Sequence, residues 1–253
     1  MKTIQTLTLF QTLLITGLLL TFQARAESKE IAFSSTKSQV SVIELYTSEG
    51  CSSCPPADRW LNKFKKSDLL WNKVVPLAFH VDYWDYLGWK DKFADKRFSH
   101  RQVVYQQNKY LSTVYTPGVM KNGREWRGWP WWQGPESNDT NEPGTLAVAL
   151  NNQEMNIVFE PKLNINTGYF LNVALLGNDI TSKVKAGENE GKSFEHEFVV
   201  LHFSRHFQNT KSDVKWNIKN PLLNTSQKIN AIGIWITHGV NPTPIQATGT
   251  WIN

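Results

Sequence analysis

Cysteine is scarce in this chain. Its 253 residues include only two, Cys51 and Cys54, which form a C-x-x-C arrangement. With no third thiol, any disulfide exchange must run through this pair and a partner outside the chain. The sequence therefore confines thiol chemistry to one short segment.

An excess of one charge is also lacking. The chain has 27 Lys and Arg against 22 Asp and Glu, a net charge of +5. Residues 1–26 contribute Lys2 and Arg25 but no acid, so the remainder has 25 basic and 22 acidic residues, a balance of +3. Such a small excess, without a stripe of Lys and Arg, gives little support for nucleic-acid binding, and we expect no nucleic-acid partner.

Long hydrophobic runs are absent after the first 26 residues. Lys2 precedes an apolar run at 7–22, and Ala24-Arg25-Ala26 has the small-x-small pattern of a signal-peptidase site. We expect residues 1–26 to be a signal peptide; the alternative is an uncleaved anchor, because the run is near the lower limit for spanning a bilayer. We therefore expect a secreted or periplasmic protein with no transmembrane span after signal cleavage. Isolated disulfides are common in such oxidising compartments.

Residues 38–125 alternate between strand and helix patterns, which predicts an α/β domain. Four apolar residues after Pro55 and Pro56 have the i, i+3, i+4, i+7 spacing of one helix face, and Asn122-Gly123 is a hairpin signal. The predicted elements are a strand at 40–47, a helix from Pro55, a strand at 74–81, a weaker helix at 93–111 and a short strand at 118–121.

The composition changes after residue 125. Residues 126–143 hold four Trp among Gly, Pro, Asn and Ser, and we interpret them as a linker or ordered loop whose rings pack between domains; carbohydrate binding is the alternative. Residues 144–253 have an all-β pattern that is typical of a sandwich. Its predicted strands are 145–150, 155–160, 169–176, 195–203, 214–218, 232–237 and 245–251.

The position of the cysteines suits thiol chemistry. They follow a buried strand and precede a helix, whose N-terminus carries a positive dipole end that stabilises a thiolate. Two intervening residues leave the second sulfur within reach of the first. By position, Cys51 is expected to be the exposed nucleophile and Cys54 the resolving thiol.

Several stretches resemble a known family. Residues 42–58 (VIELYTSEGCSSCPPAD) and 78–91 (AFHVDYWDYLGWKD), together with 114–117 (VYTP), are similar to the secreted thioredoxin-like family called domain of unknown function 1223. Weaker pieces are 187–192 (GENEGK) and 246–251 (QATGTW). The resemblance implies an α/β thioredoxin-like N-terminal domain, which we expect to be followed by an all-β, sandwich-like C-terminal domain.

The resemblance assigns further residues to the site. It implies that the Thr116-Pro117 bond is cis and lies against Cys51, with Pro117 catalytic and Thr116 available to a bound peptide; an ordinary trans proline is the alternative. Glu44 lies near the place where thioredoxins keep a buried carboxylate that relays a proton to the resolving thiol. An edge-facing, solvated Glu44 is equally compatible with the pattern, and Glu49 is a weaker competitor.

Polar residues also follow the second predicted strand. His80 and Asp82 stand at its carboxyl end, where α/β sheets place ligands, so they are candidates for substrate contact. In the alternative, His80 is a hydrogen-bonded packing residue. We expect no metal, although Cys51, Cys54 and His80 together have the chemistry of a copper(I) or zinc site.

Three functions remain open. The first is a thiol-disulfide oxidoreductase that needs no cofactor and acts on protein thiols or disulfides outside the chain. The second is a non-catalytic binding module in which the disulfide is structural. The third is a copper-handling protein that uses both cysteines and His80.

Overall fold

The computed structural model describes residues 30–132, 141–162, 168–209, 214–225, 227–239 and 241–252. The predicted signal peptide, residues 1–26, lies outside these ranges. Within them, no helix has both the length and the apolar character needed to cross a membrane.

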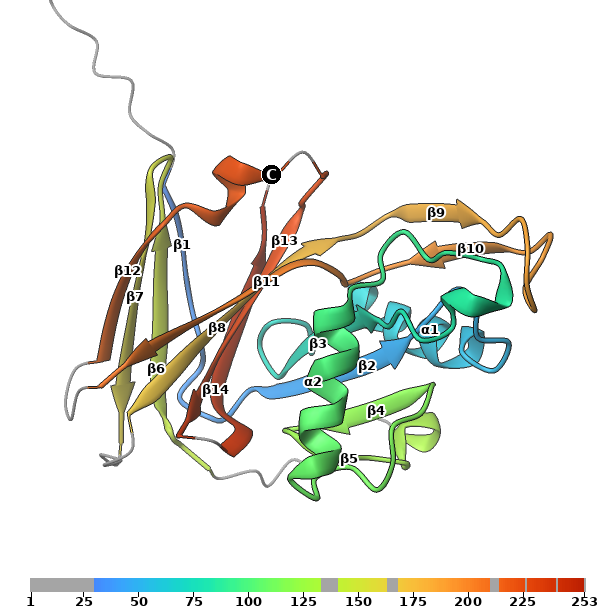
Figure 1. Cartoon of the computed structure of the whole chain (residues 1–253). Helices are drawn as coiled ribbons and strands as arrows, with labels where there is room; N and C mark the ends of the chain where they lie inside the picture. The colour runs from blue at the N-terminus through green and yellow to red at the C-terminus, as the bar shows by residue number, and fades with distance from the viewer. Residues whose placement is uncertain are drawn as a thin grey trace, which may run out of the picture.

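Most of the strands belong to one eight-stranded sheet (Figure 1). Its order is β14 (Asn241–Trp251), β13 (Ala231–His238), β8 (Tyr169–Gly177), β11 (Val199–Gln208), β3 (Val74–His80), β2 (Ser41–Thr47), β4 (Gly118–Lys121) and β5 (Arg124–Glu125). The predicted strands at 40–47, 74–81 and 118–121 are thus confirmed as β2, β3 and β4.

Two helices cover opposite faces of this sheet. They are α1 (Pro55–Asn62) and α2 (Lys96–Gln107), and Figure 1 shows α2 in front of β2 and β3 with α1 behind. Consecutive residues of β2 point to opposite faces of the sheet and so contact different helices. Tyr46 packs against Tyr105 of α2, whereas the hydroxyl of Thr47 donates to Asp58 of α1. Within the described ranges there are also four short 3-10 helices: η1 (Lys63–Lys66), η2 (Asp85–Leu87), η3 (Trp129–Trp131) and η4 (Pro221–Asn224).

The predicted α/β thioredoxin-like domain is wrong, because the described chain is a largely all-β fold. Strand β3 pairs in parallel with β11 through Val199 and Ala78, so the sheet continues from β2 and β3 into β8, β13 and β14. The helices between its strands are only 8 and 12 residues long. Periodicity located the strands correctly, but it carries no information about a partner more than a hundred residues away.

A second sheet packs against the distal part of the first. It contains β1 (Ile31–Ser34), β6 (Gly144–Leu150), β7 (Glu154–Pro161) and β12 (Val214–Lys219), in that order. Alternate residues of both sheets point inward and form one apolar core, for example Ile157 and Phe159 of β7 with Leu171 and Val173 of β8. Strand β1, which the sequence pattern did not predict, pairs antiparallel with β6.

A two-stranded ribbon carries the chain from the sheet toward the cysteines. Strands β9 (Ile180–Lys183) and β10 (Ser193–His196) follow β8 and precede β11, and they extend past the sheet on the side of α1 (Figure 1). Asn62 of α1 donates from Nδ2 to the carbonyl of Glu195, 2.8 Å away, which ties the ribbon to the helix. The tip of the ribbon, residues 184–192, thereby reaches the C-x-x-C segment.

The Trp-rich stretch packs on α1. Trp60 of α1 contacts the rings of Trp126 and Trp129 at centroid distances of 5.9 and 5.3 Å, and Phe64 contacts Trp132 at 5.7 Å. Three of the four Trp rings therefore pack on the core around α1 rather than between domains as predicted, and the fourth, Trp131, is 80% exposed. Residues 133–140 of the predicted linker lie outside the described ranges.

Candidate functional site: the disulfide loop and the polar network beneath it

The two cysteines form a disulfide at the start of α1. Cys54 is the N-cap residue, and its carbonyl accepts hydrogen bonds from the N–H groups of Ala57 and Asp58 at 2.9 and 3.2 Å. Pro55 and Pro56 occupy the first turn, where a missing N–H leaves no hydrogen bond unmade. The predicted arrangement of strand, turn and helix around the pair is confirmed.

Neither cysteine is exposed. The relative accessibility of both residues is 0%, while Ser52 and Ser53 between them lie at the surface. The expectation that Cys51 is an exposed nucleophile is therefore wrong for this conformation. The Sγ of Cys51 lies 3.4 Å from Oγ of Ser53. A reacting thiol can reach the disulfide only after this loop moves.

The ribbon tip holds the backbone of the disulfide loop. Asn189 is fully buried, and its Nδ2 donates to the carbonyls of Glu49 and Cys51 at 2.8 and 3.0 Å. Glu188 accepts a hydrogen bond from the N–H of Ser52 at 3.2 Å. The sequence singled out these two residues only as part of the weaker resemblance at 187–192. Their role was missed because nothing in a polar turn indicates which distant backbone it will satisfy.

Replacing Asn189 by Ala is expected to lower the free energy of unfolding by about 1–3 kcal/mol, because the buried carbonyl of Glu49 loses its side-chain donor and that of Cys51 keeps only the N–H of Cys54. The disulfide should also be reduced faster by dithiothreitol, since the loop loses its main tether. Chemical denaturation and reduction kinetics measure the two effects. Asn217→Ala on the exposed face of β12 is the matched control and should leave both unchanged; equal reduction rates in the two variants would contradict a tethering role for Asn189.

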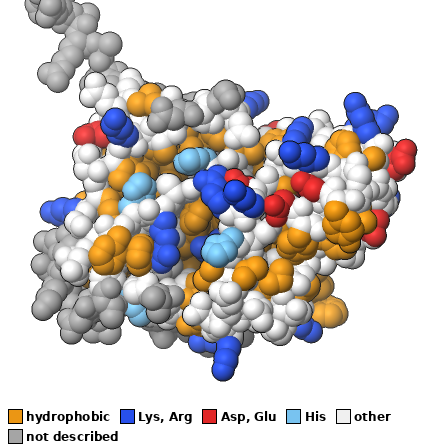
Figure 2. All heavy atoms as spheres, in the orientation of Figure 1, with side chains coloured by type: hydrophobic (Ala, Val, Ile, Leu, Met, Phe, Trp, Pro, Cys, Tyr) orange, Lys and Arg blue, Asp and Glu red, His pale blue; other side chains and the backbone are white. Residues whose placement is uncertain are grey.

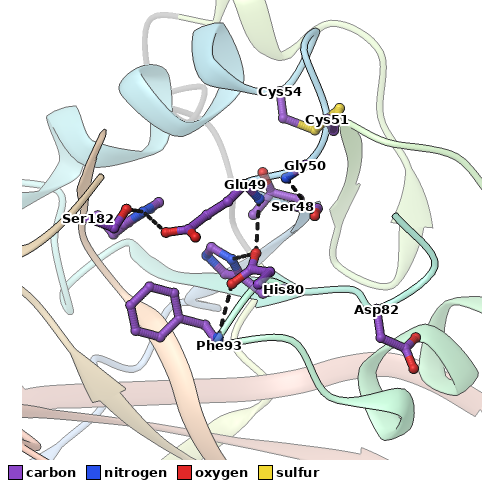
Figure 3. A network of polar contacts seen from close by, with 12 residues as sticks. Ser48, Glu49, Gly50, Cys51, Cys54, His80, Asp82, Phe93 and Ser182 are labelled. Atoms are coloured by element: carbon purple, nitrogen blue, oxygen red, sulfur yellow. Dashed lines mark hydrogen bonds and ion pairs between the residues drawn. A yellow bond between two sulfur atoms is a disulfide. The ribbon is translucent and has the colours of Figure 1, made fainter. Parts of the chain in front are cut away.

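Glu49 is the centre of a polar network beneath the loop. Its Oε1 lies 3.0 Å from Nε2 of His196, and its Oε2 accepts from Nε1 of Trp89 at 2.7 Å. Figure 3 shows the side chain pointing away from the disulfide and toward Ser182 of β9. Burial favours the neutral acid, but the hydrogen bonds from His196, Ser182 and Trp89 outweigh it and lower the pKa of Glu49.

His80 and Asp91 form a second buried pair in the same network. Nδ1 of His80 lies 2.7 Å from Oδ2 of Asp91, which also accepts from the N–H of Glu49 at 2.9 Å. Burial alone would lower the pKa of His80, but the Asp91 carboxylate raises it above the ordinary value. Burial would likewise raise the pKa of Asp91, but the charge and hydrogen bond of His80 hold it below the ordinary value. Asp91 thus connects an ion pair to the backbone of the disulfide loop.

The location of His80 favours the packing interpretation over substrate contact. The residue is 1% exposed, and its ring packs against those of Phe93 and His196 at 5.3 and 5.2 Å. Its Nε2 is buried without a hydrogen-bond partner among the described residues. Among all the residues that the structure describes, no group of three or more His, Cys, Asp or Glu side chains is arranged to hold a metal ion. The structure therefore gives the trio Cys51, Cys54 and His80 no support as a metal site.

Glu44 is buried, as expected for a proton-relaying carboxylate, but its side chain lies on the face of the sheet that α2 covers. Its carboxylate pairs with Arg101 of α2 at 2.8 and 2.9 Å and accepts from the hydroxyl of Tyr105 at 2.7 Å. Thr47, on the opposite face of the same strand, points toward α1 instead. The geometry therefore makes Glu44 part of an ion pair under α2 and does not bring it to the cysteines.

Asp58 is a carboxylate on the helix that begins at the disulfide. It stands four residues after Cys54 on α1, so both occupy one side of the helix. The hydroxyl of Thr47 donates to its Oδ2 at 3.1 Å, and burial raises the pKa of Asp58 against the lowering effect of His80 and His196. The residue also lines a cavity of about 290 Å³ between α1 and the ribbon. The i, i+4 spacing from Cys54 is the sequence signal that could have identified it.

The Thr116-Pro117 peptide bond is cis, as predicted. Oγ1 of Thr116 accepts a hydrogen bond from Nε1 of Trp84 at 2.7 Å. Gly50, next to Cys51, lies so close to Trp84 that a Cβ on the glycine would come within 3.1 Å of the Trp84 Cβ. Trp84 therefore connects the disulfide loop with Thr116, while direct contact of Pro117 with Cys51 stays a prediction.

Asp82 does not join the network. Its carboxylate accepts a hydrogen bond from the hydroxyl of Ser99 in α2. Figure 3 shows its side chain on the far side of His80, pointing away from the disulfide. Of the two polar residues predicted at the end of β3, His80 is thus buried beneath the disulfide loop, whereas Asp82 contacts α2.

Comparisons with known proteins match most of the chain. Residues 42–236 match the family described as "Protein of unknown function (DUF1223)". The crystal structure of protein AGR_C_4864 from Agrobacterium tumefaciens is 24% identical with a TM-score of 0.59, and the alignment covers 85% of this chain and 94% of that one. HBP35 of Porphyromonas gingivalis is 14% identical with a TM-score of 0.60, covering 85% and 76%. No curated protein matches the sequence. Such low identities show similarity of fold alone.

Proposed function

Since the chain belongs to the DUF1223 family, whose description assigns no activity, its function must be argued from the site, and we propose a secreted or periplasmic thiol-disulfide oxidoreductase that works through Cys51 and Cys54. The observation that carries the proposal is the disulfide of a C-x-x-C segment at the N-terminus of α1. The positive dipole end of the helix stabilises a thiolate there, which makes the reduced pair reactive.

The exchange reaction needs no cofactor. A thiolate of the partner protein attacks Sγ of Cys51, a mixed disulfide forms, and the bond between Cys51 and Cys54 breaks with Cys54 leaving as a thiolate. A second thiolate of the partner then attacks the mixed disulfide, which oxidises the partner and releases Cys51. Two electrons enter the pair and the partner gives up two thiol protons. The reverse sequence reduces a partner disulfide.

Asp58 supports this chemistry from one helical turn below Cys54. A thiolate that leaves inside the protein needs a proton, and a carboxyl group whose pKa is raised by burial holds one more readily than an ordinary aspartate. Asp58 also lines the cavity beside α1, so water has access to it. The proposal therefore assigns proton exchange with Cys54 to Asp58 in place of Glu44.

The second candidate is a binding module with a permanent structural disulfide. It is favoured by one observation, the complete burial of both cysteines under Ser52, Ser53 and the ribbon tip. A disulfide with this role must resist reduction, whereas an exchange site must open. Accessibility of the sulfurs in solution therefore separates the two candidates.

Cysteine replacement tests the proposal. Cys54→Ala leaves Cys51 without a resolving thiol, so we expect it to accumulate mixed disulfides with other proteins in an oxidising extract. These species should disappear on reduction and should not form with the double variant Cys51→Ala/Cys54→Ala. Non-reducing electrophoresis followed by mass spectrometry identifies them.

A redox titration supplies the second measurement. The wild-type pair should equilibrate with a glutathione buffer and have a measurable reduction potential, and Cys51 should be alkylated faster than Cys54 once the pair is reduced. A disulfide that remains closed throughout the titration, together with no trapped partner, would support the structural role and reject the oxidoreductase.

A further inference from the structure

A second cavity lies between α2 and the strands of the large sheet, and neither cysteine lines it. It measures about 280 Å³ and is bounded by α2, β8, β11 and β13. Figure 2 shows basic and histidine side chains gathered in the middle of this face, over the region where Figure 1 places α2 and β11. The residues that matter for its chemistry are Arg97, His100, Arg101, Phe203, Arg205 and Thr237.

Three arginines line the cavity, and two of them are paired with a carboxylate. Arg97 pairs with Asp95, and Arg101 pairs with Glu44. Arg205 has no such partner among the described residues, and its guanidinium lies 3.7 Å from the ring centroid of Phe170. Partial burial and the repulsion of Arg101 lower the pKa of Arg205. One full positive charge thus faces the cavity without a counter-charge.

The walls supply an apolar surface and hydrogen-bonding groups. Phe203 stacks on Trp235 at a centroid distance of 5.6 Å, so its ring is fixed in the cavity wall. The hydroxyl of Thr237 accepts a hydrogen bond from Nδ2 of Asn172 at 3.3 Å, which leaves its own proton available to a ligand. Arg101 uses Nε and Nη2 in its bonds to Glu44 and Tyr105, and no described residue accepts a hydrogen bond from its Nη1.

We infer that this cavity binds a small organic monocarboxylate with an aromatic or other apolar body. A single uncompensated guanidinium matches one negative charge, and its planar donor pair fits a carboxylate in two parallel hydrogen bonds. A phosphate dianion would bring a second charge that no further unpaired arginine neutralises. The volume is below that of pockets for drug-sized ligands, which restricts the occupant to a small molecule.

Binding of benzoate tests the inference. Titration of the oxidised wild-type protein, followed by calorimetry or by amide shifts in NMR spectra, should show saturable binding of benzoate, and benzamide and inorganic phosphate should bind more weakly. Arg205→Gln should weaken benzoate binding about tenfold or more, because a charge-assisted hydrogen bond is lost. Although Arg205 is partly covered by the cavity wall, its side chain reaches the surface, so the variant is expected to fold normally.

Arg59→Gln is the matched control, because Arg59 is an exposed arginine that lines the cavity beside α1 instead. It should bind benzoate as the wild type does. The inference is overturned if benzoate does not saturate the wild type, if benzamide or phosphate binds as tightly, or if Arg205→Gln retains full affinity. None of these results depends on the redox state or activity of the cysteines.

Discussion

Replacing Arg101 by Met is expected to lower the free energy of unfolding by about 3–5 kcal/mol, because it leaves the buried carboxylate of Glu44 without its counter-charge. Glu44 is 0% exposed, and Arg101 holds both of its oxygens at 2.8 and 2.9 Å. Methionine preserves much of the packing, since the guanidinium of Arg101 lies against the rings of Phe79 and Phe203. Chemical denaturation measures the loss.

Two further variants show whether charge or packing is responsible. Adding Glu44→Gln to Arg101→Met should recover a large part of the loss, because the stranded charge is removed. Arg97→Met, on the same helix, breaks the exposed pair with Asp95 and should cost no more than about 1 kcal/mol. If the double variant is as unstable as Arg101→Met, the ion pair is not the cause.

Asp91→Asn is expected to have the second large effect, about 3–5 kcal/mol at its maximum, because it removes the counter-charge of buried His80. Asparagine keeps the shape of the side chain and an oxygen for the N–H of Glu49, so the variant tests the charge. The pKa of His80 should fall, since burial lowers it and only the weaker charges of Asp58 and Glu49 then oppose burial. NMR titration of the His80 ring measures this change directly.

The pH dependence of this loss follows from the two shifts. The raised pKa of His80 gives a stabilisation that is complete below the unfolded value of about 6.5 and is lost as the pH rises through the folded value. The lowered pKa of Asp91 gives a second stabilisation, which is complete above the unfolded pKa of about 3.9 and is lost as the pH falls through the folded-state pKa of Asp91. The difference between wild type and Asp91→Asn should therefore be largest between about pH 4 and 6.5 and should narrow in alkaline solution.

Asp68→Asn, an exposed substitution, is the control for Asp91→Asn and should leave stability nearly unchanged at every pH. A difference that grows with rising pH would have the wrong sign and would show that His80 is neutral in the folded protein. The result also concerns the disulfide loop, because Asp91 accepts the N–H of Glu49 two residues before Cys51.

Local features were predictable because their causes are local. The apolar run of 40–47 and the prolines after Cys54 predicted β2 and the start of α1, and both are present. The cis bond before Pro117 followed from the resemblance to a known family. Most strands of residues 144–253 were located by their alternation, but β9 was not predicted, and the predicted strand at 195–203 spans the end of β10 and the start of β11.

The functional environment was not predictable in the same way. Glu44 was recognised as a candidate buried carboxylate, but its direction depends on which helix covers which face of β2. Asn189 and Asp91 hold the disulfide loop from 138 and 42 residues away, through hydrogen bonds to backbone groups that any residue possesses. Arg205 differs from Arg97 and Arg101 in forming no ion pair with a described residue, and the sequence does not show which arginines are paired.

The sequence by itself determined the position of the single thiol pair, its location between a strand and a helix, and the strands that carry it, because these depend on neighbours within a few residues. Only the tertiary structure decided that β3 joins β11 in one large sheet, that the ribbon tip holds the backbone of the disulfide loop, and that Glu44 pairs with Arg101 on the other face of β2. The physical reason is that strand pairing, burial and the electrostatic surroundings of a side chain arise from segments far apart in the chain, which meet only when it folds.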